Sequence, residues 1–166
     1  TNPNNSSLSS THGKWLEDRF TNTTFMTIDL TSTYLEFNAL LTNSDQGSDL
    51  GFANTKSRLR MVTLYQVAAA QSGLVVGTGN KVEDFGVGFY TKYGDGGVDI
   101  SPIADLMKSE VVSLASSLGI DRRILQAPPT DGLWDDDRTD EAQLGLSYSD
   151  LEDAMENKSS INRPKY

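Results

Sequence analysis

The segment 59-LRMVTLYQVAAAQSGLVV-76 decides the predicted fold class of this chain. Apolar residues recur at intervals of three and four through residues 59–70, which predicts an amphipathic helix. Gly73 is placed to end that helix. Residues 74–76 then form a short apolar run of the kind that predicts a strand buried on both faces.

A second strand is predicted upstream of this segment. The sequence TTFMTIDL at residues 23–30 is typical of a strand, and the spacing of Trp15, Leu16 and Phe20 predicts a short helix before it. A strand, a helix and a further strand in this order are the βαβ unit of a parallel sheet. We therefore predict an α/β fold with a mostly parallel sheet.

The downstream half contains a long loop and two further helices. The glycine-rich residues 77–101 far exceed the usual connection of about 4–6 residues, and such loops are usually functional. A helix is predicted over residues 108–118. A last short helix is predicted to begin near Ser147, whose hydroxyl fits a capping box with Asp150.

Composition limits the function classes. The chain has 166 residues, 37% of them hydrophobic, which predicts a single domain with one core. It has no apolar run long enough for a membrane span, and the polar residues 1–10 do not look like a signal peptide. Cysteine is absent, which removes disulfides, zinc–thiolate sites and thiol nucleophiles. The cytoplasm is the expected compartment.

Charge and histidine content narrow the chemistry further. The lone histidine, His12, lies far from every motif, so histidine-based catalysis is not expected. A formal net charge of −9 argues against a nucleic-acid partner, because phosphate neutralisation dominates such binding. An anionic ligand would need a locally basic pocket and a metal ion.

Three segments could carry chemistry, and each also has a purely structural interpretation. Residues 77–80, GTGN, follow a predicted strand, where ligands bind in parallel sheets, although the glycines could simply allow a turn. Residues 83–99 could form a mobile loop in which Lys92 contacts an anion, or ordinary turns and packing. Arg58 and Tyr65 project from nearly one helix face and could hold a carboxylate or phosphate, or form an exposed edge.

The chain resembles the NAD synthetases in three long segments. These are NTKSRLRMVTLY at 54–65, the run from LVVGTGN to MKSEV at 74–111, and the run from APPTDGLWDDD to LEDAM at 127–155. The family belongs to the adenine nucleotide alpha-hydrolase-like ATP pyrophosphatases. The resemblance implies a Rossmann-like three-layer α/β/α fold with a mostly parallel sheet.

The resemblance also implies a reaction. In it, the carboxylate of deamido-NAD attacks the α-phosphorus of ATP, and ammonia then displaces AMP from the acyl-adenylate to give NAD. The implied ligands are ATP, deamido-NAD, ammonia and Mg²⁺, and the implied assembly is a homodimer. The alternatives are another amidotransfer or thiolation enzyme of the superfamily, or a non-catalytic nucleotide-binding remnant.

Roles follow from the resemblance residue by residue. Contacts to deamido-NAD are implied for one group of residues, namely Arg58, Tyr65, Lys92 and Asp99. Contacts to ATP are implied for a second group, namely Thr78, Lys108 and Thr130. Glu83 corresponds to a magnesium-binding glutamate, and no side chain is expected to form a covalent intermediate.

Two family motifs do not occur in this sequence. They are the SGGxDS phosphate loop, which holds pyrophosphate, and a C-terminal His-Lys pair. We therefore expect residues 1–166 to be a single NAD synthetase domain that lacks both segments, and to be inactive when expressed alone.

Overall fold

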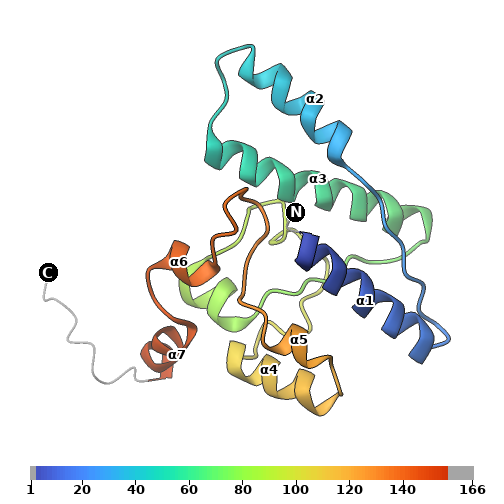
Figure 1. The fold of residues 1–166 in the computed structure, drawn as a ribbon, viewed down its shortest axis with the longest axis vertical. Coiled ribbons are helices and arrows are strands. Elements are labelled where there is room, and N and C mark those ends of the chain that lie inside the picture. The colour runs from blue at the N-terminus through green and yellow to red at the C-terminus, as the bar shows by residue number, and fades with distance from the viewer. Residues whose placement is uncertain (1–2, 157–166) are drawn as a thin grey trace, which may run out of the picture.

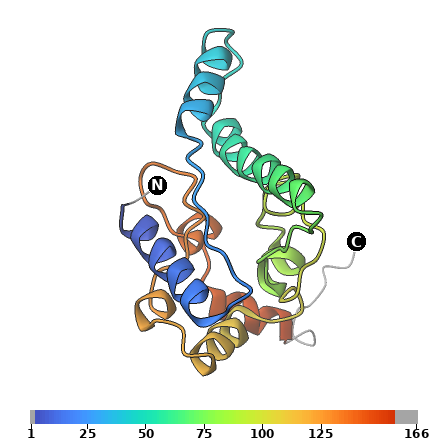
Figure 2. The ribbon, with the colours of Figure 1, turned by 90° about the vertical axis from the view of Figure 1, so that its right-hand side faces the viewer.

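A computed structural model describes residues 3–156 of the chain. The elements within this range are helical, and their order is α1 (Pro3–Arg19), α2 (Thr31–Thr42), α3 (Asp49–Ala70), the π-helix η1 (Val82–Val87), α4 (Lys108–Ser117), α5 (Arg122–Leu125), α6 (Asp140–Leu144) and α7 (Tyr148–Glu156). Helices α2 and α3 pair and project from one end, and the other helices gather below them (Figures 1 and 2).

The predicted parallel sheet is not confirmed within residues 3–156. The one strand-like pairing described there is a parallel bridge between Val76 and Ile100. It is joined by hydrogen bonds from the Gly77 amide to the Ile100 carbonyl, at 2.7 Å, and from the Asp99 amide to the Val75 carbonyl, at 3.0 Å. The prediction that residues 74–76 are buried on both faces is wrong, because only Val75 is buried and Val76 is 55% exposed.

The strand predicted at residues 23–30 is also wrong. This segment is irregular, and its Phe25 amide donates to the Glu17 side chain, at 3.0 Å, instead of to a neighbouring strand. The ring of Phe25 lies directly against Gly13 of α1. A strand needs a partner backbone, and none of the described residues supplies one here.

Helices α1 and α3 begin earlier than predicted, and α2 was not predicted. Polar Ser, Asn and Thr residues obscure the period of α1. Helix α3 starts at Asp49, ten residues before the apolar pattern, where the Ser48 side chain accepts a hydrogen bond from the Gly51 amide at 3.2 Å. Its end before Gly73 agrees with the prediction, since the Gly73 amide donates to the Ala68 carbonyl at 2.8 Å.

The two downstream helices are confirmed. Helix α4 runs from Lys108 to Ser117, one residue short of the predicted end. Helix α7 starts at Tyr148 after a capping box, in which the Asp150 amide donates to the Ser147 hydroxyl at 3.1 Å and the Ser147 amide donates to the Asp150 carboxylate at 3.3 Å. None of the described helices is long and apolar enough to cross a membrane.

The main buried apolar cluster lies where α7 meets η1 and α4. It consists of Val82, Met107, Tyr148 and Leu151, with Leu144 and Met155 packed against it. Full burial of one such side chain contributes about 1.5–3 kcal/mol. The cluster therefore fixes η1 and the first turn of α4, the two elements that carry Glu83 and Lys108.

Candidate functional site

The residues matched to deamido-NAD contacts converge on α3 and the loop opposite it. The Arg58 side chain donates from Nε to the Lys92 carbonyl at 3.1 Å. The Tyr65 hydroxyl donates to the Asp99 carboxylate at 3.1 Å, and the Val75 amide donates to the other Asp99 oxygen at 2.8 Å. The fold therefore brings α3 against the loop in two separate pairs, Arg58 with Lys92 and Tyr65 with Asp99.

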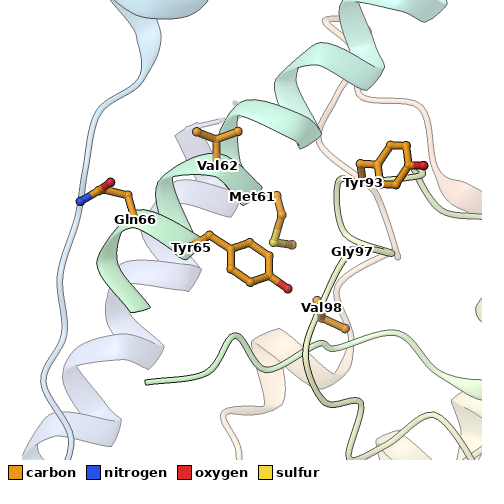
Figure 3. A pocket seen from close by; sticks show the side chains of 7 residues that line it. All are labelled: Met61, Val62, Tyr65, Gln66, Tyr93, Gly97 and Val98. Carbon is orange, nitrogen blue, oxygen red and sulfur yellow. The ribbon is translucent and has the colours of Figure 1, made fainter. Parts of the chain in front are cut away.

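An open cavity of about 670 Å³ lies beside Tyr65, within the usual volume range of small-ligand pockets. In Figure 3, Tyr65 and Met61 extend from α3 toward Val98 and Gly97 of the loop. The lining residues are Met61, Val62, Tyr65, Gln66, Tyr93, Gly97 and Val98. Partial burial, followed by the hydrogen bond to Asp99 and the charge of Asp99, raises the pKa of the Tyr65 phenol.

The loop that carries Lys92 is held against α3 by side-chain hydrogen bonds. The Ser57 hydroxyl donates to the Asp95 carboxylate at 2.7 Å, and the Thr91 hydroxyl donates to the Asn54 amide oxygen at 2.7 Å. Gly94 lies so close to Ser57 that a Cβ atom would collide with the Ser57 hydroxyl. The loop backbone is therefore fixed, while the exposed Lys92 side chain extends over the Tyr93 ring, with Nζ 5.0 Å from its centroid.

Glu83 and Lys108 form a second cluster, built from η1 and α4. The Lys108 ammonium donates to Glu83 Oε1 at 2.9 Å. Asn80, which is buried, begins η1 by accepting hydrogen bonds from the Val82 and Glu83 amides, at 3.0 and 3.1 Å. The asparagine of the GTGN segment therefore sets the direction of the Glu83 backbone.

Tyr148 and Asp140 complete this cluster. The Tyr148 hydroxyl faces two carboxylates, at 2.7 Å from Glu83 Oε1 and 3.3 Å from Asp140 Oδ2. Because a hydroxyl has one proton to donate, the shorter contact to Glu83 is its main hydrogen bond. Asp140 is 93% buried, since 7% of it is exposed, and its Oδ1 atom has no hydrogen-bond partner among the described residues.

The cluster sets opposite pKa shifts on its two carboxylates. Burial acts to raise the pKa of Glu83, but hydrogen bonds from Tyr148 and Lys108 and the Lys108 charge outweigh it, so this pKa lies below its ordinary value. Burial, together with the charges of Asp131 and Glu83, raises the pKa of Asp140. Glu83 is therefore held as a carboxylate, whereas the charged form of Asp140 is disfavoured.

The two oxygens of Glu83 differ in their partners. Oε1 accepts from Lys108 and Tyr148, whereas among the described residues Oε2 accepts one long contact, from the Asn80 amide at 3.4 Å. Within the described part of the chain, no group of three or more acidic, histidine or cysteine side chains could enclose a metal ion. This fits Mg²⁺, which often binds one or two carboxylates and takes its other ligands from phosphates and water.

The two threonines matched to ATP contacts are not joined to Lys108 by any described hydrogen bond. Thr78 is exposed just after the Val76 bridge. The Thr130 hydroxyl donates to the Arg138 carbonyl at 3.1 Å and shapes its own loop. The neighbouring Pro129 carbonyl accepts from the Asp140 amide at 3.0 Å, which connects the Thr130 loop to the cluster.

Sequence reasoning missed Tyr148 and Asp140. The capping box at Ser147 located the helix that carries Tyr148, but an aromatic residue at its start is equally typical of core packing. Asp140 lies in an acidic stretch that looks like a solvated loop. A capping pattern could have found Asp140, since the Thr139 hydroxyl accepts from the Ala142 amide at 3.1 Å.

We expect Asp140→Asn to raise the free energy of unfolding by about 1 kcal/mol at pH 7, because an amide removes a buried charge whose Oδ1 is unpartnered. The pKa of Asp140 in the folded protein lies above its ordinary value of 3.8. Asp140 therefore stabilises the fold fully when the pH is below 3.8, and this contribution is lost as the pH rises through the folded pKa. The gain should therefore shrink as pH falls toward 3.8. Urea unfolding at several pH values measures it, with exposed Asp153→Asn as the control. Equal or lower stability of Asp140→Asn at pH 7 would contradict this expectation.

Comparison with known proteins gives the family. Residues 2–164 match the sequence pattern of the family described as NAD synthase. The NH(3)-dependent NAD(+) synthetase of Archaeoglobus fulgidus is 49% identical over 110 residues, which cover 66% of this chain and 44% of the relative. That of Mycoplasmopsis pulmonis is 43% identical over 134 residues, covering 81% of this chain and 50% of the relative. The chain therefore belongs to the NAD synthase family, and it spans about half the length of the curated relatives it matches.

Solved structures agree with this assignment. The NMN synthetase from Francisella tularensis superposes with a TM-score of 0.75 and 33% sequence identity, over 85% of this chain and 58% of that one. The NAD+ synthetase from Burkholderia pseudomallei gives a TM-score of 0.62 and 30% identity, over 81% of this chain and 52% of that one. These likenesses are consistent with the predicted α/β class.

Proposed function

We propose that this protein takes part in the ATP-dependent amidation of deamido-NAD by ammonia to give NAD, AMP and pyrophosphate. The observation that carries the proposal is the pairing of α3 with the facing loop, where Arg58 contacts Lys92 and Tyr65 contacts Asp99, with Tyr65 also lining a cavity of ligand size. The resemblance of the sequence to the family implies contacts to deamido-NAD for these four residues. Family membership supports the same reaction.

The chemistry requires activation of a carboxylate. A free carboxylate is a poor electrophile, so its oxygen attacks the α-phosphorus of ATP, the bond to pyrophosphate breaks, and ammonia then displaces AMP from the acyl-adenylate. In this scheme Arg58 and Lys92 bind the anionic parts of deamido-NAD, and Tyr65 supports its ring. Asp99 keeps Tyr65 and the loop in register through its two oxygens.

Both substrates are polyanions, and the chain has a net charge of −9, so local cations must offset repulsion. At 4 Å and an effective dielectric of about 20, one lysine or arginine contact contributes about 4 kcal/mol of attraction before desolvation. We assign Lys108 to the phosphates of ATP, with Thr78 and Thr130 at its edges, and Glu83 to Mg²⁺. The bound ion would supply charge neutralisation at the phosphates.

We also propose the three-layer fold and the homodimer that the family resemblance implies. The Val76–Ile100 bridge would belong to the parallel sheet of a Rossmann-like three-layer fold. A homodimer is proposed because α3 leaves apolar side chains exposed on two sides, with Val62 68% and Leu64 49% exposed, and exposed apolar surface is typical of protein interfaces. Sedimentation at micromolar concentration measures this state.

A second substrate is favoured by one specific observation. The structural neighbour with the TM-score of 0.75 is an NMN synthetase, and the two NAD synthetase structures with at least 25% identity score lower, at 0.57 and 0.62. Amidation of nicotinic acid mononucleotide would use the same activation chemistry. It would leave the part of the site that holds the adenylate half of deamido-NAD without a ligand.

The test is an assay of the product encoded by the complete gene with ATP, Mg²⁺ and ammonia. Deamido-NAD and nicotinic acid mononucleotide are supplied separately, and amide formation and AMP release are measured together. We expect equal amounts of amide and AMP, with higher kcat/KM for deamido-NAD. Amide formation with the mononucleotide alone would support the second substrate, and AMP release without amide would reject both.

A further inference from the structure

Tyr148 contacts both Glu83 and Lys108. Its hydroxyl donates to Glu83 Oε1 at 2.7 Å, and the ammonium of Lys108 lies 4.8 Å from the centroid of its ring. A hydroxyl that donates to a carboxylate and a ring face that holds a cation are both directional contacts. One side chain therefore orients both the Glu83 carboxylate and the Lys108 ammonium.

The pair needs such a support because its two members lie on short or terminal elements. Glu83 belongs to a six-residue π-helix, an element that is rare and usually a local distortion. Lys108 is the first residue of α4, where backbone amides have no partners within the helix. Helix α7 packs against both η1 and α4, so it is placed to hold the distance between them.

A second contact ties α7 to the start of α4. The Ser109 amide and hydroxyl both donate to the Glu152 carboxylate, at 2.8 and 2.7 Å. Glu152 lies one turn beyond Tyr148 on α7. The helix is therefore fixed to α4 at two successive turns, and its rotation is restricted.

These contacts also fix the direction of the second oxygen of Glu83, Oε2. Tyr148 and Lys108 both occupy Glu83 Oε1, so Oε2 is the oxygen presented to a ligand. Without the Tyr148 hydroxyl, the Glu83 carboxylate would be held by Lys108 and by the long contact from the Asn80 amide, and its plane could rotate more freely. Lys108 alone can follow either oxygen, because its ammonium has three rotatable donors.

We propose that Tyr148 is a positioning residue, whose hydroxyl and ring orient Glu83 and Lys108 for binding of Mg²⁺ and ATP. This inference rests on the proposed function for the identity of those ligands. Tyr148 does not touch the ligands itself. Its effect on ATP and Mg²⁺ is transmitted through the two side chains that it contacts.

The simpler alternative is that Tyr148 only fills the core, where it packs with Val82, Met107 and Leu151. Tyr148→Phe separates these two roles, because it keeps the ring and its packing and removes the hydroxyl. The chain also offers a matched control. Tyr34 carries the ammonium of Lys56 5.2 Å from its ring centroid, on α2 and far from Glu83 in the sequence.

The experiment compares the wild type, Tyr148→Phe and Tyr34→Phe in the complete gene product. Calorimetry measures binding of ATP with Mg²⁺ and, separately, binding of deamido-NAD. Loss of one hydrogen bond to a charged group predicts about tenfold weaker Mg²⁺-dependent ATP binding for Tyr148→Phe, with deamido-NAD binding unchanged. Tyr34→Phe should bind both as the wild type does.

Two outcomes would overturn the inference. One is ATP binding by Tyr148→Phe that equals the wild type, and the other is an equal loss for both ligands, which would indicate a general effect on the fold. A second measurement keeps the test independent of the proposed function. The NMR shifts of the Lys108 side chain should carry a ring-current displacement that persists in Tyr148→Phe and disappears in Tyr148→Leu.

This second readout separates the two possible failures. If the wild type binds no Mg²⁺ and ATP but shows the ring-current displacement, the proposed function fails while the contact stands. If ATP binds but the displacement is absent in the wild type, the positioning role of Tyr148 fails alone.

Discussion

Lys108→Ala is expected to weaken ATP binding by about tenfold to a hundredfold, while binding of deamido-NAD stays within about twofold of the wild type. The estimate follows from loss of a charge-assisted contact, which contributes about 1.5–3 kcal/mol. Lys108 opens α4, so in the proposed complex its ammonium and the partial positive charge of the helix N-terminus would act on the same phosphates. Calorimetry with each ligand measures the effect.

Lys56→Ala is the matched control for this experiment. Lys56 also pairs with a carboxylate, Asp135 at 3.1 Å, and also lies over a tyrosine ring, that of Tyr34. It is part of neither candidate cluster. If Lys56→Ala reduced ATP binding as much as Lys108→Ala does, the loss would reflect net charge and not the position of Lys108.

The positions of the candidate residues were predictable to different degrees. The pattern at residues 59–70 located most of α3, and the resemblance placed Arg58 and Tyr65 on one face of it. Their contacts could not be predicted, because they depend on the path of the loop around Lys92. That path is set by Ser57 and Asp95, two small polar residues with no distinctive pattern in the sequence.

The sheet shows a different limit of sequence reasoning. The β propensity of residues 23–30 describes how well these side chains suit a pleated surface, but a strand forms only when another backbone lies beside it. The same holds for residues 74–76, where one bridge to Ile100 is the pairing found within residues 3–156. Helices α4 and α7 were predictable because their hydrogen bonds are internal and their caps are local.

Tyr148 could not be assigned a role from the sequence, because its significance depends on three separate elements. Glu83 lies 65 residues before it and Lys108 lies 40 residues before it, 148 minus 108. No local period relates such distances. The buried position of Tyr148 fits core packing, and its contacts to Glu83 and Lys108 indicate a second role.

Glu83→Gln is expected to raise the Mg²⁺ concentration that gives half-maximal turnover by at least about tenfold, and to leave the fold intact at neutral pH. A neutral amide is a poorer ligand for a hard cation than a carboxylate. Even mutation of a residue that only hydrogen-bonds a metal ligand lowers metal affinity by about tenfold to a hundredfold. The assay follows NAD formation against Mg²⁺ concentration. An unchanged Mg²⁺ dependence would reject Glu83 as a metal ligand.

The same substitution should also change how stability depends on pH. The folded pKa of Glu83 lies below its ordinary value of 4.5, so its stabilising contribution is complete above that pH and is lost as pH falls through the folded value. Glu83→Gln removes this contribution, so the variant should be less stable than the wild type at pH 7, and the difference should narrow below about pH 4.5. Exposed Glu36→Gln on α2 is the control and should follow the wild type throughout. A constant difference between Glu83→Gln and the wild type across this range would show that the Glu83 charge, and with it the ion pair to Lys108, does not stabilise the fold.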